Sequence, residues 1–248
     1  MQKTVKIQPQ RVPELVLEQL MEWIMDGRLA MGQKLNTEEL AQELGVSRMP
    51  VREAIKNLEK MGVAESIPYA GSRLVMLDKK DIQQIYLMRE TLEPILGYHA
   101  CTSATDAEIA EVIRIQDNFE SVMTGGEGTA KEIFICNRDF HFSIYRAARM
   151  DRIFHTVSML WDNLAFAKLI FGQNYVESSD AAQRMMAQHR GFVDALSSRD
   201  APLLKRLLAE NLERTARRLP EKLSGYLEGE MSPRKSVRIS LTRNEVDA

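Results

Sequence analysis

Three basic residues recur at helical spacing between positions 48 and 56 of the sequence. Arg48, Arg52 and Lys56 lie at i, i+4 and i+8, so a helix would carry them on one face. The opposite face of the same helix is apolar and consists of Val51, Ile55 and Leu58. Arginine can bond guanine through two hydrogen bonds, and arginine or lysine can pair with phosphate. The segment therefore predicts a helix that buries one face and offers the other to double-stranded DNA.

The flanking segments favour DNA binding over the alternative, which is a charged face that is merely solvated. A periodic apolar segment over Pro13–Asp26 and a short one capped by Asn36 predict two preceding helices, and Gly45 begins a tight turn. Residues 63–67 and 73–77 have the composition of two short strands joined by a turn. Helix, short helix, turn, helix and hairpin is the order of a winged helix-turn-helix.

Other residues around this helix are also candidates for contact with DNA. Ser47 precedes its first turn, where we expect the hydroxyl to cap the helix and the free backbone amides to suit a phosphate. The hairpin contains a glycine, which allows close backbone approach, and an arginine, which adds positive charge. The complete set of expected DNA contacts is Ser47, Arg48, Met49, Pro50, Arg52, Lys56, Gly71, Ser72 and Arg73.

From Lys79 onward, the hydrophobic periodicity predicts helices only. We expect them near 81–103, 106–123, 129–148, 151–171, 180–198 and 201–226. The predicted fold is therefore mainly α, with an N-terminal winged helix-turn-helix followed by an all-α helical bundle. The predicted domains are 1–78 for DNA binding, 79–226 as an all-helical domain, and 227–248 as a C-terminal extension.

A second candidate site lies on the inward faces of these later helices. Asn137 and His141 are four residues apart, while His189 and Asn211 stand beside apolar residues on two further helices. A histidine among apolar residues is more often a hydrogen-bonded core residue than a metal ligand. Arg89 could bind an anion through two hydrogen bonds, or it could form a structural pair with Glu93, its i+4 neighbour.

The composition is that of a globular protein in a reducing compartment. The net charge of the 248 residues is −2, so any DNA-binding charge must be local. Cys101 and Cys136 fall within apolar helical patterns and are expected to be buried free thiols. The N-terminus does not have the pattern of a signal peptide, and no apolar run approaches the ~18 residues of a membrane span. We therefore expect a cytoplasmic protein with no membrane partner.

The segment from Gly27 to Leu77 resembles the winged helix of the GntR family. The matching run is Leu35-x4-Leu40-Ala41-x2-Leu44-Gly45-Val46-Ser47-Arg48-x-Pro50-Val51-Arg52-Glu53-Ala54. The resemblance implies a transcriptional regulator, more often a repressor than an activator. It also implies a homodimer on pseudo-palindromic operator DNA. Glu38 departs from the pattern, since many members have a DNA-contacting arginine there, and it is not among the expected contacts.

The later helices resemble the FadR-type sensing domain, FCD. The matching runs are Met88-Arg89-x2-Leu92-Glu93, Asn137-x2-Phe140-His141 and His189-x6-Leu196-x3-Asp200. The resemblance implies that residues 79–226 are an effector-binding and dimerisation domain, in which a small organic acid binds and controls operator affinity. In many members an aspartate and three histidines hold a divalent metal that helps bind the acid. The corresponding residues here are Asn137, His141, His189 and Asn211.

Two alternatives remain open for these four residues. They could hold one divalent metal of the Zn or Ni class, although the two neutral asparagines provide no negative charge to offset a dication. They could instead hydrogen-bond the effector directly, together with Arg89. A metal-dependent enzyme would need a general base, and no Asp or Glu stands at the ligand positions, so we expect no enzymatic activity. The helix beginning near Asp81 joins both domains and is the expected lever between them.

Overall fold

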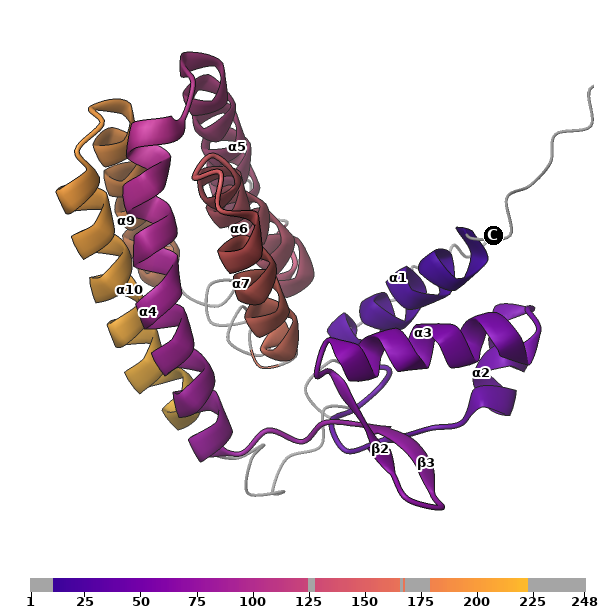
Figure 1. Cartoon of the computed structure of the whole chain (residues 1–248). Coiled ribbons are helices and arrows are strands. Elements are labelled where there is room, and N and C mark those ends of the chain that lie inside the picture. The colour runs from indigo at the N-terminus through magenta and orange to yellow at the C-terminus, as the bar shows by residue number, and fades with distance from the viewer. Residues whose placement is uncertain (1–10, 125–127, 166, 168–178, 223–248) are drawn as a thin grey trace, which may run out of the picture.

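The computed structural model describes residues 11–124, 128–165, 167 and 179–222. The N-terminal part consists of α1 (Arg11–Met25), β1 (Lys34–Leu35), α2 (Thr37–Leu44), α3 (Arg48–Lys60), β2 (Ala64–Ile67) and β3 (Gly71–Leu74). The C-terminal part consists of α4 (Lys79–Ser103), α5 (Asp106–Thr124), α6 (Ala130–Arg146), α7 (Asp151–Asn163), α9 (Ser179–Ser197) and α10 (Ala201–Lys222). Figure 1 shows the two parts joined by the segment between β3 and α4. The predicted fold, a winged helix-turn-helix followed by an all-α bundle, is confirmed.

Side-chain caps explain where several helices begin. The Asn36 side chain accepts hydrogen bonds from the amides of Glu38 and Glu39 at the start of α2. Asp78 and Asp81 form a reciprocal capping box at the start of α4. Ser47 precedes α3 as expected, but its hydroxyl makes no capping hydrogen bond, so that prediction is wrong. The residue takes the extended backbone of a cap position without turning its hydroxyl toward the α3 amides.

The wing is a three-stranded antiparallel sheet in the order β1-β3-β2. The predicted second strand, 73–77, is displaced, because pairing of Gly71 with Ile67 starts β3 two residues earlier and the strand ends at Leu74. The two-residue strand β1 was not predicted, since it carries too few residues for a periodic pattern. Its Lys34 pairs with Arg73 in register.

Each part has its own apolar core. The α1 and α3 stripes expected from the sequence are buried, with Val16, Leu20, Trp23, Ile24, Val51, Ile55 and Leu58 at most 7% exposed. In the C-terminal part, α4 lies along α10, and Gly97 makes the close approach to Leu204 and Leu208 possible. α7 ends at Asn163, short of the predicted 171, and residues 168–178 and the predicted extension 227–248 lie outside the described residues.

The cysteine prediction is half right. Both thiols are free, but only Cys101 is buried, whereas Cys136 is half-buried. Burial raises the pKa of the Cys101 thiol to about 11. Among the described helices, none has both the length and the apolar character needed to cross a bilayer.

Candidate functional site

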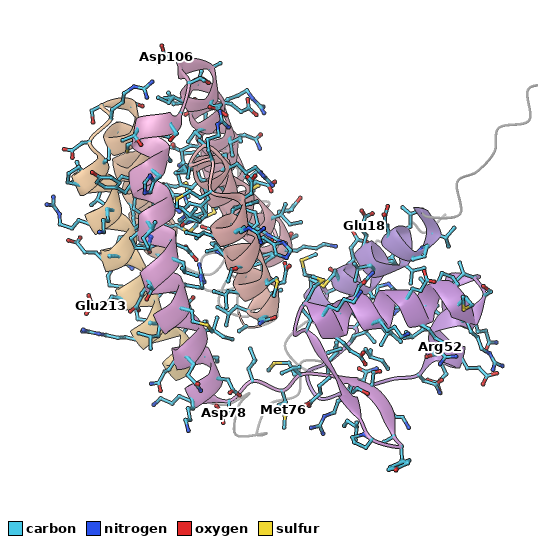
Figure 2. All side chains as sticks on the ribbon, viewed as in Figure 1. Glu18, Arg52, Met76, Asp78, Asp106 and Glu213 are labelled. Carbon is cyan, nitrogen blue, oxygen red and sulfur yellow. The ribbon has the colours of Figure 1, made fainter. Side chains whose placement is uncertain are left out.

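The helix α3 presents its basic residues on one exposed face. Arg48, Arg52 and Lys56 are all exposed, whereas Val51, Ala54, Ile55 and Leu58 on the other face are buried. Figure 2 shows Arg52 on the part of α3 that lies away from the C-terminal helices. The arrangement matches the spacing seen in the sequence and leaves this basic face free to approach a polyanion.

An acidic residue from α2 joins this basic face. Glu38 forms an ion pair with Arg48, and both side chains are about two-thirds exposed, at 68% and 66%. This pair was not expected from the sequence, because the two residues lie on different helices ten positions apart. It places a negative charge beside the first turn of α3.

The wing residues expected to contact DNA have partners within the chain. The Ser72 hydroxyl donates to Glu59 at 2.7 Å, and Arg73 Nε lies 2.7 Å from a carboxylate oxygen of Glu65. Gly71 has a positive φ of 88°, which favours glycine at this turn. Tyr69, which is not among the expected contacts, is fully exposed in the turn between β2 and β3, also at a positive φ, 63°.

The remaining candidates near α3 differ in exposure. Ser47 and Met49 are exposed, and Pro50 is half-buried in the first turn. Because the Ser47 hydroxyl does not cap the helix, it supplies no acceptor to the first amides of α3. That end of the helix keeps the donors that suit a phosphate.

The centre of the C-terminal bundle contains a buried polar network around Glu93. The carboxylate, 1% exposed, pairs with Arg89 Nε at 2.5 Å. Two more donors reach it from other helices: Trp161 Nε1 at 3.0 Å and the Tyr145 hydroxyl at 2.6 Å. We call these four residues, Arg89, Glu93, Tyr145 and Trp161, the Glu93 network.

One donor of the Arg89 guanidinium has no partner among the described residues. It lies between the rings of Tyr86 and Trp161, with 4.9 Å and 4.4 Å from Cζ to the ring centroids. Burial alone would lower the pKa of Arg89, but Glu93, Tyr86 and Tyr145 together outweigh this and raise the pKa, so the arginine stays charged. Nη1 is buried and makes no hydrogen bond to any residue that the structure describes. The predicted pair with Glu93 therefore exists, and it leaves a charged donor for a further acceptor.

The two expected histidines meet beside this network. The rings of His141 and His189 lie edge to face, with centroids 5.1 Å apart. His141 Nδ1 is 3.2 Å from the Tyr145 hydroxyl, and His189 Nδ1 is 3.2 Å from Gln116 Oε1. Burial, and next the proximity of His141, lowers the pKa of His189 well below its usual value. His189 is therefore neutral at physiological pH.

These residues do not make a site for a divalent cation on their own. No group of three or more His, Cys, Asp or Glu able to hold a metal occurs in the described part of the chain. Asn137 and Asn211 are half-buried, and the contacts seen between described residues do not bring them into the Glu93 network. Glu93 is the carboxylate at hand, and it already accepts three hydrogen bonds. Two neutral imidazoles leave the charge of a buried dication uncompensated.

Sequence reasoning identified only part of this cluster. Tyr145 is four residues after His141, so helical spacing could have found it. Trp161 and Gln116 contact their partners across 68 and 73 positions of sequence, a separation that local spacing does not reveal.

Each half of the chain matches the model of a known protein family. A model described as "Bacterial regulatory proteins, gntR family" matches residues 14–74, and the FCD domain model matches residues 84–214. A probable D-xylose utilization operon transcriptional repressor of Paenarthrobacter nicotinovorans is 31% identical over 193 residues, which cover 76% of this chain and 80% of that protein. The Nta operon transcriptional regulator of Aminobacter aminovorans is 30% identical over 143 residues, covering 58% and 67%.

Solved structures show the same fold. The structure of E. coli McbR/YncC matches with a TM-score of 0.74 at 21% identity, covering 85% of this chain and 98% of that chain. A GntR regulator from Rhodococcus sp. RHA1 matches with a TM-score of 0.63, also at 21% identity, covering 84% and 96%. With a winged helix and an FCD domain in this order, the chain belongs to the GntR family of bacterial transcriptional regulators.

Proposed function

We propose that the chain is a repressor that binds operator DNA through the basic face of α3 and releases it when a small anionic metabolite occupies the FCD domain. The observation that carries the DNA-binding half is the exposed row Arg48, Arg52 and Lys56 opposite a fully buried face. Relatives named as operon repressors support the sign of the regulation. We further propose a homodimer, because two-fold symmetry of the protein matches two half-sites.

In this proposal, the two ends of α3 contribute differently to binding. Arg48, in the first turn, enters the major groove and bonds a guanine edge, while the free amides at the same end meet a phosphate. Lys56, two turns later, pairs with the phosphate backbone. Arginine at the first position thus gives specificity, and lysine gives affinity without specificity.

The effector half rests on the unpartnered Nη1 of Arg89. A buried cationic donor without an acceptor is costly, and a carboxylate on the effector would satisfy it. The nearby imidazoles of His141 and His189, together with Asn137 and Asn211, would hydrogen-bond the rest of the molecule directly. A ligand changes DNA affinity only if it binds the DNA-competent and DNA-incompetent states with different affinity.

Fluorescence anisotropy with a duplex selected by the protein from a random library tests the DNA assignment. Arg48→Ala should weaken binding to the selected duplex by ~1–3 kcal/mol and reduce its preference over random DNA. Lys56→Ala should weaken both duplexes equally and reduce the slope of log affinity against log salt by about one. Lys205→Ala, an exposed cation on α10, is the matched control and should change neither. Unchanged discrimination by Arg48→Ala would refute its assignment.

Thermal shift with gluconate and D-xylose, chosen from the names of relatives, tests the effector half. We expect the acid, and not the neutral sugar, to raise the melting temperature and to reduce DNA affinity. Arg89→Lys keeps the positive charge but replaces the guanidinium, with its separate Nε and Nη1 donors, by a single ammonium nitrogen, so it should lose the shift while remaining folded. Elemental analysis of untagged protein gives the metal content. An effector response that depends on added zinc or nickel would overturn direct binding.

A further inference from the structure

The last residues of α7 contact the DNA-binding part of the molecule. With its amide nitrogen facing the carbonyl groups, Asn163 donates to the main-chain oxygen of Met61 and to that of Met159, the latter at 3.3 Å. The next residue after Met61 is Gly62, at a φ of 71°, where a Cβ would lie 3.1 Å from the Asn163 amide. A side chain of the FCD domain therefore sits directly against the C-terminal end of α3.

The contact supplies a hydrogen-bond donor to a carbonyl group at the C-terminal end of α3. The last carbonyl groups of a helix have no partners within the helix. The amides of Met61, Gly62 and Val63 turn back to the oxygens of residues 57, 59 and 58, respectively. Met61 lies beyond these carbonyls, and the donor for its own oxygen comes from Asn163. A residue of the FCD domain thus caps the C-terminal end of α3, the helix proposed to read DNA.

The two residues before Asn163 belong to the interior of the sensing domain. Trp161 donates to Glu93 at 3.0 Å, and its ring lies against the Arg89 guanidinium. Asp162, 8% exposed, pairs with Arg138 of α6 at 2.6 Å. Three consecutive residues at the end of one helix therefore join the Glu93 network, α6 and the end of α3.

We infer that Asn163 is a positioning residue for DNA reading, through which the end of α7 sets the orientation of α3. Figure 1 shows the end of α7 facing the C-terminal end of α3, with the N-terminal end of α3 pointing away. A helix of 13 residues is about 20 Å long, so a tilt of ~5° at its fixed end moves the other end by about 2 Å. A displacement of that size breaks hydrogen bonds to base edges.

This inference rests on the proposed DNA-binding role of α3, and it adds a second route by which the FCD domain can act on that helix. The sequence points to α4 as the lever, because α4 follows the wing through the chain. Val75 and Leu77, in the segment between β3 and α4, line the same small cavity as Gly62 and Asn163. Asn163 acts on the recognition helix itself, without passing through the wing.

Tryptophan emission provides a test that does not require the effector. The chain has two tryptophans, so Trp23→Phe leaves Trp161 as the single reporter, and Trp161 is 1% exposed in the FCD core. Coupling is reciprocal, so DNA that orients α3 must alter the surroundings of α7. We expect the selected duplex to change Trp161 emission in this parent protein. Asn163→Ala should reduce that change at least about threefold at saturating duplex.

The control and the second variant keep the outcomes distinct. Asn118→Ala, at an exposed asparagine of α5, should leave the emission change intact. If circular dichroism shows that Asn163→Ala does not fold, Asn163→Asp replaces it. The aspartate has the same size but no N–H donor, so it should also reduce the change in Trp161 emission at least about threefold. Absence of an anisotropy rise in the parent would refute DNA binding itself. The inference is overturned if the parent binds DNA normally but its Trp161 emission does not change. It is also overturned if the Asn163 variants bind DNA and show the full change in emission.

Discussion

At the scale of single residues, the ion pair between Glu38 and Arg48 reduces the positive charge that α3 offers to DNA. The glutamate pairs with the arginine that would enter the major groove, so a guanine edge must compete with a carboxylate for the same guanidinium. An exposed pair of this kind is worth little, in general about 0.2–1 kcal/mol. We therefore expect Glu38 to moderate affinity for DNA without blocking it.

The Glu38→Gln substitution tests this moderation. Removing the competing charge should strengthen binding to random duplex about twofold to fivefold at low salt, the equivalent of ~0.5–1 kcal/mol. Glu53→Gln, which removes the same charge from α3 at a residue with no ion pair among the described residues, should have the smaller effect in the same anisotropy titration. A loss of sequence preference in Glu38→Gln would instead indicate that the glutamate reads a cytosine.

Residue-scale prediction succeeded where the relevant spacing is local. The basic face of α3 and its buried opposite face follow from intervals of three and four residues, and the structure shows both. In the Glu93 network, the Arg89–Glu93 pair follows from local spacing, whereas Trp161 and Tyr145 reach Glu93 from other helices, where the sequence could not place them. Periodicity identifies which residues face inward, but it does not identify which helices face each other.

At the scale of elements, the close packing of α4 on α10 depends on Gly97. A Cβ at this position would lie 2.2 Å from Leu208 Cδ1 and 3.4 Å from Leu204 Cγ, and both leucines are fully buried. Neither leucine can move aside without disturbing the core, because protein interiors are closely packed. The glycine sets the distance between the two helices.

Gly97→Ala should therefore lower the free energy of unfolding by ~1–3 kcal/mol, as overpacked cores generally do. The matched control is Gly191→Ala on α9, where the Cβ would lie 3.8 Å from Leu207 Cδ1, an ordinary contact. That control should be neutral or more stable by ~0.5–1 kcal/mol, since alanine favours a helix over glycine. Urea unfolding of both variants measures the difference, and equal shifts would contradict the packing explanation.

The start of each element was more predictable than its length. The cap at Asn36 is encoded within a few residues and the structure confirms it, and Asp78 caps α4 through equally local contacts. The limits of β3 depend instead on pairing with β1 and β2, so the strand begins and ends earlier than its composition suggests. The end of α7 likewise coincides with its contact on the winged helix, which a single-helix pattern does not contain.

At the scale of the whole molecule, the two parts are also held by charge. Lys131 of α6 lies 3.2 Å from Asp26 and 3.7 Å from Glu22, both at the end of α1. Met21 and Met25 of α1 pack against the core of the C-terminal bundle. The winged helix therefore contacts the bundle through α1 as well as through α3.

Lys131→Glu should loosen this contact, because it replaces attraction with repulsion at two carboxylates. The pair is partly exposed, so we expect a change of about 0.5–1 kcal/mol, which corresponds to an open population larger by ~2–5-fold. Limited proteolysis at the segment between Leu74 and Lys79 should accelerate by the same factor. Lys205→Glu makes the same charge change on α10 and should leave the cleavage rate unaltered.

The carbonyl group of Met61 also limits how this regulator can be recombined. A hybrid that joined its winged helix to the sensing domain of another protein would remove the Asn163 amide that serves this oxygen. A fully buried polar group left without a partner costs ~1–3 kcal/mol, and Met61 is half-buried, so we expect the loss in such a hybrid to be smaller. A sensing domain that brings a hydrogen-bond donor to the same place would avoid this loss.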